Sequence, residues 1–264
     1  MLKRLCAFLL LAVGVAAAKA EPVSISLPDG SVLKAELYRP AKPRPDAAAI
    51  ILLHGCGGLY PERDNGWRDT FLLDGRFVLM PLSFLSRGLG SQCTHPDAIA
   101  SPYTVRRDDT IAAAHWLNAQ SFTPAGGIVV MGFSHGGSTV LAAADAMPEG
   151  LVRGYVALYP GCGVISRRSD WHPRAPLAIF MGASDDWTLP RYCRQMVDKQ
   201  PPGAVQLTLY PDSYHDFDAP TPVRTREGNA GTTVHVGLNA AARTAVYESA
   251  PAFINALPPL AGSK

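Results

Sequence analysis

The sequence has no surplus of charge of one sign and, beyond its first residues, no long hydrophobic run. Lys and Arg together number 24, and Asp and Glu number 22. The first 20 residues hold three of the basic residues and none of the acidic ones, so 21 basic and 22 acidic residues remain after them. A nearly neutral chain lacks the basic face that nucleic-acid phosphates require, so we expect no nucleic-acid partner. Without a later apolar run of bilayer length, we also expect no stable membrane insertion.

The sequence also lacks internal repeats and low-complexity linkers. A composition of 47% hydrophobic and 17% charged residues is typical of a packed globule. The length suits one α/β domain, which we place at residues 21–264. The Pro-rich stretch at residues 41–46 is short enough to be a loop within that domain.

The N-terminal region has the pattern of a secretory signal peptide. Lys3 and Arg4 precede the apolar residues 5–18, and Ala18 and Ala20 are the small residues that a signal peptidase requires. A transmembrane anchor is the alternative, but the apolar run is short for a hydrocarbon core of about 30 Å. We therefore expect residues 1–20 to be removed after Ala20, and the protein to be exported to the periplasm or secreted.

The remaining chain alternates strand and helix patterns. Residues 23–27 and 32–38 alternate apolar and polar side chains around Pro28-Asp29-Gly30, which predicts an antiparallel hairpin. Continuous apolar runs of strand length predict strands buried on both faces, and they are residues 47–53, 77–81, 128–131, 155–159, 177–181 and 205–210. Helical patterns cover residues 105–119, 138–146, 191–199 and 239–257. This order predicts a mostly parallel sheet with right-handed crossovers.

A candidate nucleophile lies between the strand at residues 128–131 and the helix that follows it. Gly132-Phe133-Ser134-His135-Gly136 fits the pattern G-x-S-x-G, in which small residues let a strand turn sharply into a helix and leave the serine exposed. The pentapeptide alone would more often be a Gly-rich turn with a solvated serine. Its position between strand and helix favours a nucleophile, and we assign that role to Ser134.

Three other loops follow predicted strands, at the edge of a parallel sheet where ligands bind. They are His54-Gly55-Cys56-Gly57-Gly58, Gly182-Ala183-Ser184-Asp185-Asp186-Trp187 and Asp212-Ser213-Tyr214-His215-Asp216-Phe217. With Ser134 they give the chain order Ser, Asp, His, each residue on a different strand end. This is the order of a serine hydrolase triad.

These residues resemble the dienelactone hydrolase family of the α/β-hydrolases, and the resemblance covers nearly all of residues 21–264. It rests on His54-Gly55, residues 132–137, residues 182–185 and Tyr214-His215-Asp216-Phe217. It implies a mostly parallel eight-stranded sheet with helices on both faces, and a hydrolase without metal or organic cofactor. The founding members of the family have cysteine as nucleophile, whereas this chain has Ser134, which favours a broader serine esterase over dienelactone as substrate.

The base and the acid of the triad follow from the chemistry and from the family spacing. A serine needs a neutral imidazole to accept its proton, and among seven histidines only His215 follows the final predicted strand of the sheet. Family spacing from Gly182 favours Asp185 as the acid that orients His215. Asp186 is then a solvated loop carboxylate or a turn cap, and Asp212 and Asp216 are weaker alternatives for the acid.

An oxyanion hole needs two preorganised donors. The backbone N–H of His135, directly after the nucleophile, is the first expected donor. The second is expected from the loop after the third strand, where Gly55, Gly57 and Gly58 leave the backbone unhindered, and we choose the N–H of Cys56. Cys56 as a catalytic thiol is a weaker alternative, because it does not stand on a strand-to-helix turn.

Four cysteines remain after residue 20, which is an even number in a chain expected to be exported: Cys56, Cys93, Cys162 and Cys193. Disulfides are therefore expected, and four cysteines allow three connectivities. The strand order of the resembling family implies Cys56 with Cys93 and Cys162 with Cys193. No pair has the close spacing of a zinc knuckle, so we expect no metal.

One arginine is a candidate for substrate selection. Arg87 follows the fourth strand, and in the resembling family an arginine in this region binds the carboxylate of the substrate. The alternative is that Arg87 bonds the backbone of its own Gly-rich loop. Trp187 and Tyr214, beside the expected acid and base, would form apolar walls of the pocket in either case.

The sequence therefore predicts a serine hydrolase of carboxylic esters or lactones acting through Ser134, His215 and Asp185. A serine peptidase is the second reading within the enzymes. A binding protein that keeps the fold without the activity is the third, since a fold does not imply a function. The sequence makes no prediction of oligomeric state.

Overall fold

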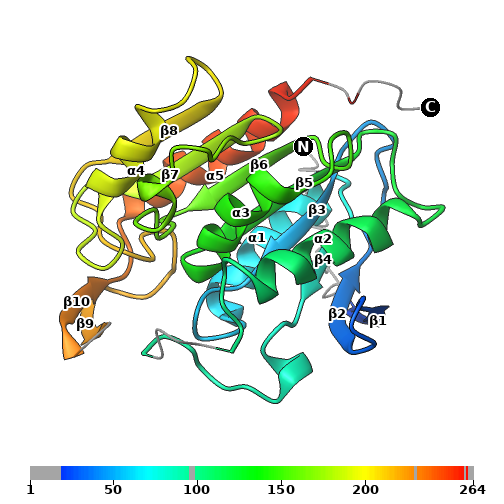
Figure 1. The fold of residues 1–264 in the computed structure, drawn as a ribbon, viewed down its shortest axis with the longest axis horizontal. Helices are drawn as coiled ribbons and strands as arrows, with labels where there is room; N and C mark the ends of the chain where they lie inside the picture. Colours follow the sequence, from blue (N-terminus) through cyan, green and yellow to red (C-terminus); the bar gives the residue numbers. More distant parts are fainter. Residues whose placement is uncertain (1–18, 95–98, 229–230, 259, 261–264) are drawn as a thin grey trace, which may run out of the picture.

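An eight-stranded sheet forms the centre of the molecule (Figure 1). The computed structural model describes residues 19–94, 99–228, 231–258 and 260. The expected leader peptide therefore lies outside the described residues, apart from Lys19 and Ala20. The strand order is β1-β2-β4-β3-β5-β6-β7-β8. The strands are β1 (Glu21–Ser26), β2 (Val32–Tyr38), β3 (Ala49–Leu53), β4 (Val78–Pro81), β5 (Ile128–Phe133), β6 (Gly154–Leu158), β7 (Leu177–Gly182) and β8 (Val205–Tyr210).

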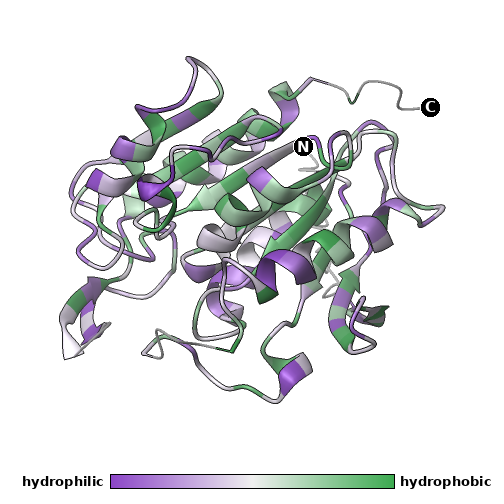
Figure 2. Ribbon diagram, viewed as in Figure 1, coloured by the Kyte–Doolittle hydropathy of each residue, from purple (hydrophilic) through white to green (hydrophobic). Residues whose placement is uncertain are grey.

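The directions of the strands agree with the sequence patterns. The alternating strands β1 and β2 pair antiparallel, and β2 joins the rest of the sheet through an antiparallel pairing with β4. All pairings from β4 to β8 are parallel. The central strands β3, β5, β6 and β7 are buried along their whole length, because helices cover both faces. Figure 2 shows the resulting hydrophobic interior.

Five α-helices and two short 3₁₀ helices are found in the described residues. They are α1 (Pro61–Leu73), α2 (Val105–Asn118), α3 (His135–Ala146), α4 (Pro190–Val197), α5 (Ala240–Ala256), η1 (Leu85–Arg87) and η2 (Ile165–Arg167). In Figure 1, α2 and α3 lie on one face of the sheet and α1 and α5 on the other. The ring of Trp67 in α1 stacks on that of Tyr247 in α5 at 4.0 Å between centroids, which joins the two helices of the second face.

Helix α1 and a small two-stranded sheet were not predicted. The helix has no strong apolar stripe, because two of its inward-facing residues, Arg63 and Asp64, form a buried ion pair with each other. The small sheet pairs β9 (Arg224–Glu227) with β10 (Thr233–Val236) antiparallel. Both strands are short, and all four residues of β9 are polar, so neither strand has the apolar run of a core strand.

No helix among the described residues is long and apolar enough to cross a bilayer.

Candidate active site

The turn from β5 into α3 holds Ser134 in a strained backbone conformation. Ser134 has φ 53° and ψ −114°, a region that side chains rarely adopt. A Cβ on Gly132 would lie 2.4 Å from the carbonyl oxygen of Gly136, and a Cβ on Gly136 would lie 2.3 Å from that of Leu53. The two glycines of the motif therefore allow the close backbone approach that this sharp turn requires.

Ser134, His215 and Asp185 form a continuous hydrogen-bonded chain. The Oγ of Ser134 lies 2.8 Å from Nε2 of His215, and Nδ1 of His215 lies 2.8 Å from Oδ2 of Asp185. They come from the ends of β5, β8 and β7, which the parallel sheet brings to one edge. All three side chains are buried, and Ser134 is the most accessible of them at 8% exposure.

The environment of His215 favours an imidazole that can exchange a proton. Burial lowers the pKa of His215, but the charge and hydrogen bond of Asp185 outweigh burial, so its pKa lies above the ordinary value. Asp185 also accepts bonds from the backbone N–H groups of Trp187 and Thr188 and from the Thr188 hydroxyl. These donors fix the carboxylate in the orientation that the imidazole needs.

Asp186, the neighbour of Asp185, points away from the triad. It accepts hydrogen bonds from the backbone N–H and from Nδ1 of His235, at 2.9 and 2.7 Å. Both side chains of this pair are more than a third exposed. Asp186 therefore links its loop to β10, a partner that the sequence did not indicate.

The loop after β3 lies beside Ser134 and is held in place at Cys56. Cys56 forms a disulfide with Cys93, and its carbonyl oxygen accepts a bond of 2.7 Å from the N–H of Gln92. The second disulfide joins Cys162 and Cys193. Both pairs are those implied by the family strand order. Among the described residues, no hydrogen-bond acceptor is found for the N–H of Cys56 or of His135.

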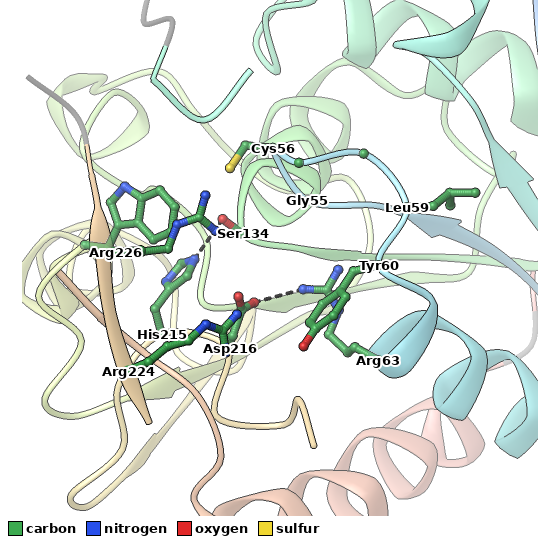
Figure 3. Close-up of a pocket in the computed structure, with 13 residues that line it drawn as sticks. Gly55, Cys56, Leu59, Tyr60, Arg63, Ser134, His215, Asp216, Arg224 and Arg226 are labelled. Atoms are coloured by element: carbon green, nitrogen blue, oxygen red, sulfur yellow. Dashed lines mark hydrogen bonds and ion pairs between the residues drawn. The ribbon is translucent and has the colours of Figure 1, made fainter. Parts of the chain in front are cut away.

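A pocket of about 210 Å³ opens onto Ser134 and His215 (Figure 3). Its other walls are the loop after β3 and the start of α1, the loops that follow β7 and β8, and strand β9. The lining residues are Gly55, Cys56, Gly57, Gly58, Leu59, Tyr60, Arg63, Trp187, Asp216, Arg224 and Arg226. The indole of Trp187 lies 4.9 Å from the His215 ring between centroids, so the apolar wall expected from Trp187 is present.

The pocket contains three arginines, and they differ in their partners. Arg63 is buried and paired with Asp64 and with Asp216, at 2.8 and 2.9 Å. Within the described part of the chain, Arg224 and Arg226 pair with no carboxylate. Arg224 donates to the hydroxyl of Thr221, and the guanidinium of Arg226 lies 4.7 Å from the Trp187 ring. Figure 3 shows Arg226 directed toward Ser134 from β9.

The ion pair of Arg63 and Asp216 lies at the turn directly after His215. Asp216 adopts φ 56° directly after His215. Burial raises its pKa, but Arg63 and then His215 and Arg226 outweigh burial, so the pKa of Asp216 lies below the ordinary value. Asp216 therefore pairs with Arg63, whereas Nδ1 of His215 contacts Asp185.

Two expected substrate-binding residues do not lie at this pocket. Both terminal nitrogens of Arg87 bond Asp109 at 2.8 Å, and Nη1 also donates to the carbonyl of Ser83. The substrate role expected for Arg87 does not fit this geometry, which matches the alternative of a loop-supporting arginine. The ring of Tyr214 instead stacks on that of His235 in β10, at 4.9 Å between centroids.

Arg63, Arg224 and Arg226 are pocket residues that sequence reasoning missed. A weak signal for two of them exists in Arg224-Thr225-Arg226, because residues two apart in a strand share one face. No local signal marks Arg63, whose partner Asp216 is 153 residues away.

No group of three or more His, Cys, Asp or Glu side chains able to hold a metal ion occurs in the parts of the chain that the structure describes.

Comparison with known proteins places the chain in a family. The profile of the dienelactone hydrolase family matches residues 33–257. A curated relative, the uncharacterized peptidase y4sO of Sinorhizobium fredii, is 28% identical over 185 residues, which is 68% of this chain and 24% of that protein. The chain thus spans about a quarter of the length of the curated relative.

Solved structures share the fold at low sequence identity. A Klebsiella pneumoniae protein assigned to the dienelactone hydrolases has 16% identity and a TM-score of 0.70, with 91% of this chain and 100% of that chain covered. The dipeptidyl peptidase 4 of Porphyromonas gingivalis has 15% identity and a TM-score of 0.66, with 92% of this chain and 36% of that chain covered. The eight-stranded sheet is thus that of the α/β-hydrolases.

Proposed function

Because this chain belongs to the dienelactone hydrolase family, we propose that it is an exported serine hydrolase that cleaves carboxylic esters or lactones. The observation that carries the proposal is the bonded chain of Ser134, His215 and Asp185, with both links at 2.8 Å. Two disulfides support export, because such bonds persist in oxidising compartments.

The first half of the reaction forms an acyl-enzyme. Ser134 Oγ attacks the ester carbonyl while its proton moves to Nε2 of His215, and Asp185 stabilises the imidazolium that results. The carbonyl oxygen becomes negative and accepts bonds from the N–H groups of Cys56 and His135, each worth about 3 kcal/mol. The C–O bond to the alcohol then breaks, and His215 returns its proton to the leaving oxygen.

The second half uses water in place of Ser134. His215 accepts a proton from the water as the water oxygen attacks the acyl carbon, and the same two N–H groups hold the new oxyanion. Collapse breaks the bond to Ser134 Oγ, which regains a proton from His215. The products are a carboxylic acid and an alcohol, or one hydroxy acid from a lactone.

Labelling with a fluorophosphonate, followed by turnover of a 4-nitrophenyl ester, tests this function. Ser134→Ala should lose both the label and the turnover. Ser184→Ala, which removes an exposed hydroxyl, is the matched control and should keep both. Labelling that survives in Ser134→Ala would overturn the assignment of the nucleophile.

The pocket arginines support a preference for esters that carry a negative group. Arg224 and Arg226 line the pocket beside the triad without a carboxylate partner in the described residues. A guanidinium can bind a carboxylate with two parallel N–H bonds. We therefore transfer the anion-binding role from Arg87 to Arg224 and Arg226.

A pair of esters of similar size tests this preference, 4-nitrophenyl hemisuccinate and 4-nitrophenyl butyrate. Arg226→Ala or Arg224→Ala should raise KM for the hemisuccinate about tenfold or more, as for a lost charged hydrogen bond. KM for the butyrate should change little. Arg191→Ala is the control, because Arg191 also packs over an aromatic ring, that of Tyr192, but does not line the pocket. Equal losses on both esters would contradict an anion site.

A serine peptidase is the second candidate, because the curated relative is named a peptidase and the structural neighbours include dipeptidyl peptidase 4. The same triad would serve either reaction. Release of nitroaniline from an amino-acyl or dipeptidyl nitroanilide faster than release of nitrophenol from the esters would favour the peptidase. Binding of the esters without any turnover would favour a non-catalytic protein.

A further inference from the structure

A buried arginine with no part in the proposed chemistry lies between the two sides of the proposed oxyanion hole. Arg106, in the first turn of α2, is 1% exposed. Its Nη2 donates to the carbonyl oxygen of His54 at 2.9 Å, and its Nη1 lies 2.7 Å from Nδ1 of His135. One guanidinium therefore joins the loop after β3 to the turn after β5.

The contact with His135 determines which imidazole nitrogen carries the proton. A guanidinium can only donate, so Nδ1 of His135 must be the unprotonated nitrogen that accepts. Burial, together with the charge of Arg106, lowers the pKa of His135 to about 3, which keeps this nitrogen free to accept at neutral pH. The bond holds the side chain of the residue whose backbone N–H is the first proposed oxyanion donor.

The contact with His54 holds the start of the other donor segment. His54 is followed by Gly55 and Cys56, whose N–H is the second proposed donor. The Nδ1 of His54 donates to the carbonyl of Gly55 at 2.8 Å, and its ring packs edge-on against Phe84 at 4.7 Å. The carbonyl of His54 is thus a fixed point from which the glycine-rich loop leaves β3.

Burying the charged guanidinium of Arg106 is energetically unfavourable. Burial lowers its pKa to about 9, and its Nε has no hydrogen-bond partner among the described residues. The carboxylate whose charge favours the protonated form of Arg106, that of Asp109, has both oxygens bonded to Arg87. A buried cation in these surroundings costs stability, so its two directed bonds point to a role beyond packing.

We propose that Arg106 is the positioning residue of the oxyanion hole, and that its guanidinium sets the separation of the Cys56 and His135 backbone N–H groups by bonding His54 and His135 together. This rests on the proposed serine hydrolase function. Oxyanion donors act mainly in the transition state, so their misplacement lowers kcat more than it raises KM. A lysine has a single charged nitrogen and cannot reproduce the fork that reaches both segments.

The test compares Arg106→Met and Arg106→Lys with the same changes at Arg76. Arg76 is a matched control because it is also buried, at 2% exposure, and also donates to a backbone carbonyl. Its Nη1 donates to the carbonyl oxygen of Ala48 at 3.0 Å, at the end of β3 that is remote from the pocket. We expect Arg106→Met to lower kcat for 4-nitrophenyl butyrate about 100-fold and Arg106→Lys about tenfold, with KM within about threefold of wild type. The Arg76 variants should lower the melting temperature without this change in kcat.

A boronic acid that forms a tetrahedral adduct with Ser134 gives a second readout. Its affinity should fall in the Arg106 variants by the same factor as kcat/KM, while the affinity for the carboxylic acid product stays constant. The proposal would be overturned if an Arg106 variant that folds has a lower melting temperature but unchanged kcat and unchanged boronate affinity. Equal effects of the Arg76 and Arg106 variants on kcat would also overturn it.

The wild-type protein separates this proposal from the proposed function. If the wild-type protein turns over esters and the Arg106 variants have the same kcat, only the positioning role is contradicted. A wild type that neither turns over the ester nor binds the boronic acid contradicts the serine hydrolase function, and the role of Arg106 with it.

Discussion

Two neighbouring aspartates have opposite environments at the residue scale. Asp185 is 3% exposed and bonds His215, whereas Asp186 is exposed and bonds His235. The peptide geometry of the loop sends successive side chains in different directions, so only one of them can reach the imidazole. Family spacing favours Asp185 as the acid, and the assignment stays a prediction that the contacts of the two carboxylates make testable.

Asp185→Asn and Asp186→Asn should therefore differ widely in turnover. Loss of the Asp185 charge should lower kcat by about four orders of magnitude, because His215 loses the partner that sets its tautomer. Asp186→Asn should lower kcat by less than about fivefold, since it weakens only an exposed pair. Steady-state kinetics with circular dichroism as a folding control measure the difference, and the reverse ranking would assign the acid to Asp186.

The pH dependence of turnover should report the state of His215. Only neutral His215 can accept the Ser134 proton, so kcat/KM should fall as pH drops through the pKa of His215, which lies above the ordinary 6.5. In Asp185→Asn the residual activity should inflect at lower pH, because burial is then opposed only by the charge of Asp216 and no longer by the charge of Asp185. A profile of kcat/KM with the same inflection in both proteins would contradict this cause.

The raised pKa also has a consequence for stability. His215 gains Asp185 as a partner on folding. The pair of Asp185 with protonated His215 therefore stabilises the folded state, and this contribution is fully present below the pKa that His215 has in the unfolded chain. That contribution is lost as pH rises through the higher folded pKa. The neutral form of His215, which the proposed mechanism requires, therefore lacks this contribution to the free energy of unfolding.

At the scale of elements, the loop after β3 depends on its connections. Gly55, Cys56, Gly57 and Gly58 have little intrinsic stiffness, and Gly58 has φ 86°. The Cys56–Cys93 disulfide and the Gln92 N–H bond hold this loop against the segment that follows β4. The second disulfide joins Cys162, in the loop after β6, to Cys193 in α4.

The two disulfides should have similar effects on stability and different effects on turnover. Their sequence separations are 37 and 31 residues, so each should contribute about 4 kcal/mol in the chain-entropy view. Removal of the first bond in Cys56→Ala/Cys93→Ala should also lower kcat about tenfold, because an oxyanion donor loses its anchor. Cys162→Ala/Cys193→Ala is the matched control. Thermal unfolding and kinetics of both variants measure this, and equal kcat values would show that the anchor is dispensable.

The hairpin of β9 and β10 gives the pocket its charge. The hairpin follows His215 in the chain. A β-bridge between His215 and Val236 and the hydrogen bond between Asp186 and His235 join it to the loops that follow β8 and β7. These links place Arg224 and Arg226 beside the triad. The two arginines proposed to bind an anionic substrate thus belong to a small element outside the main sheet.

At the scale of the whole molecule, the parallel sheet assembles the site. The strands β3, β5, β7 and β8 end at one edge, and the loops that follow them carry Cys56, Ser134, Asp185 and His215. Positions far apart in the chain meet because parallel strands share a direction. Disulfides on two sides of this edge tie down its loops.

Export can be tested on the whole chain. Expressed in a Gram-negative bacterium, the protein should be recovered from the periplasm with Glu21 as its first residue and with no titratable thiol in the unreduced, denatured state. N-terminal sequencing and thiol titration measure both properties. Replacement of Lys3, Arg4 and the apolar residues by polar ones should leave the protein in the cytosol with reduced cysteines. An intact precursor in the cytosol of cells expressing the unaltered chain would contradict export.

The sequence by itself was enough to predict the strands of the main sheet, the Ser134 turn, the Ser, Asp, His order and, with the family resemblance, the disulfide pairs. These features depend on local patterns, namely apolar periodicity, glycines at a close backbone approach, and loops that follow strands. The predicted helix at residues 138–146 begins earlier, at His135, because Gly136 and Gly137 fit close backbone contacts that outweigh their low helix propensity.

Only the tertiary structure decided where the charged side chains act. Arg87 bonds Asp109, Arg63 bonds Asp216, and Arg106 bonds His54 and His135, across separations of 22 to 153 residues. A charge has no periodicity that reveals its partner, and burial makes it costly to leave unpaired, so the partner is determined by what the packed chain brings within about 3 Å. For the same reason α1, with an ion pair facing inward, lacked the apolar pattern of a helix, and the cationic pocket became visible only when β9 was placed beside Ser134.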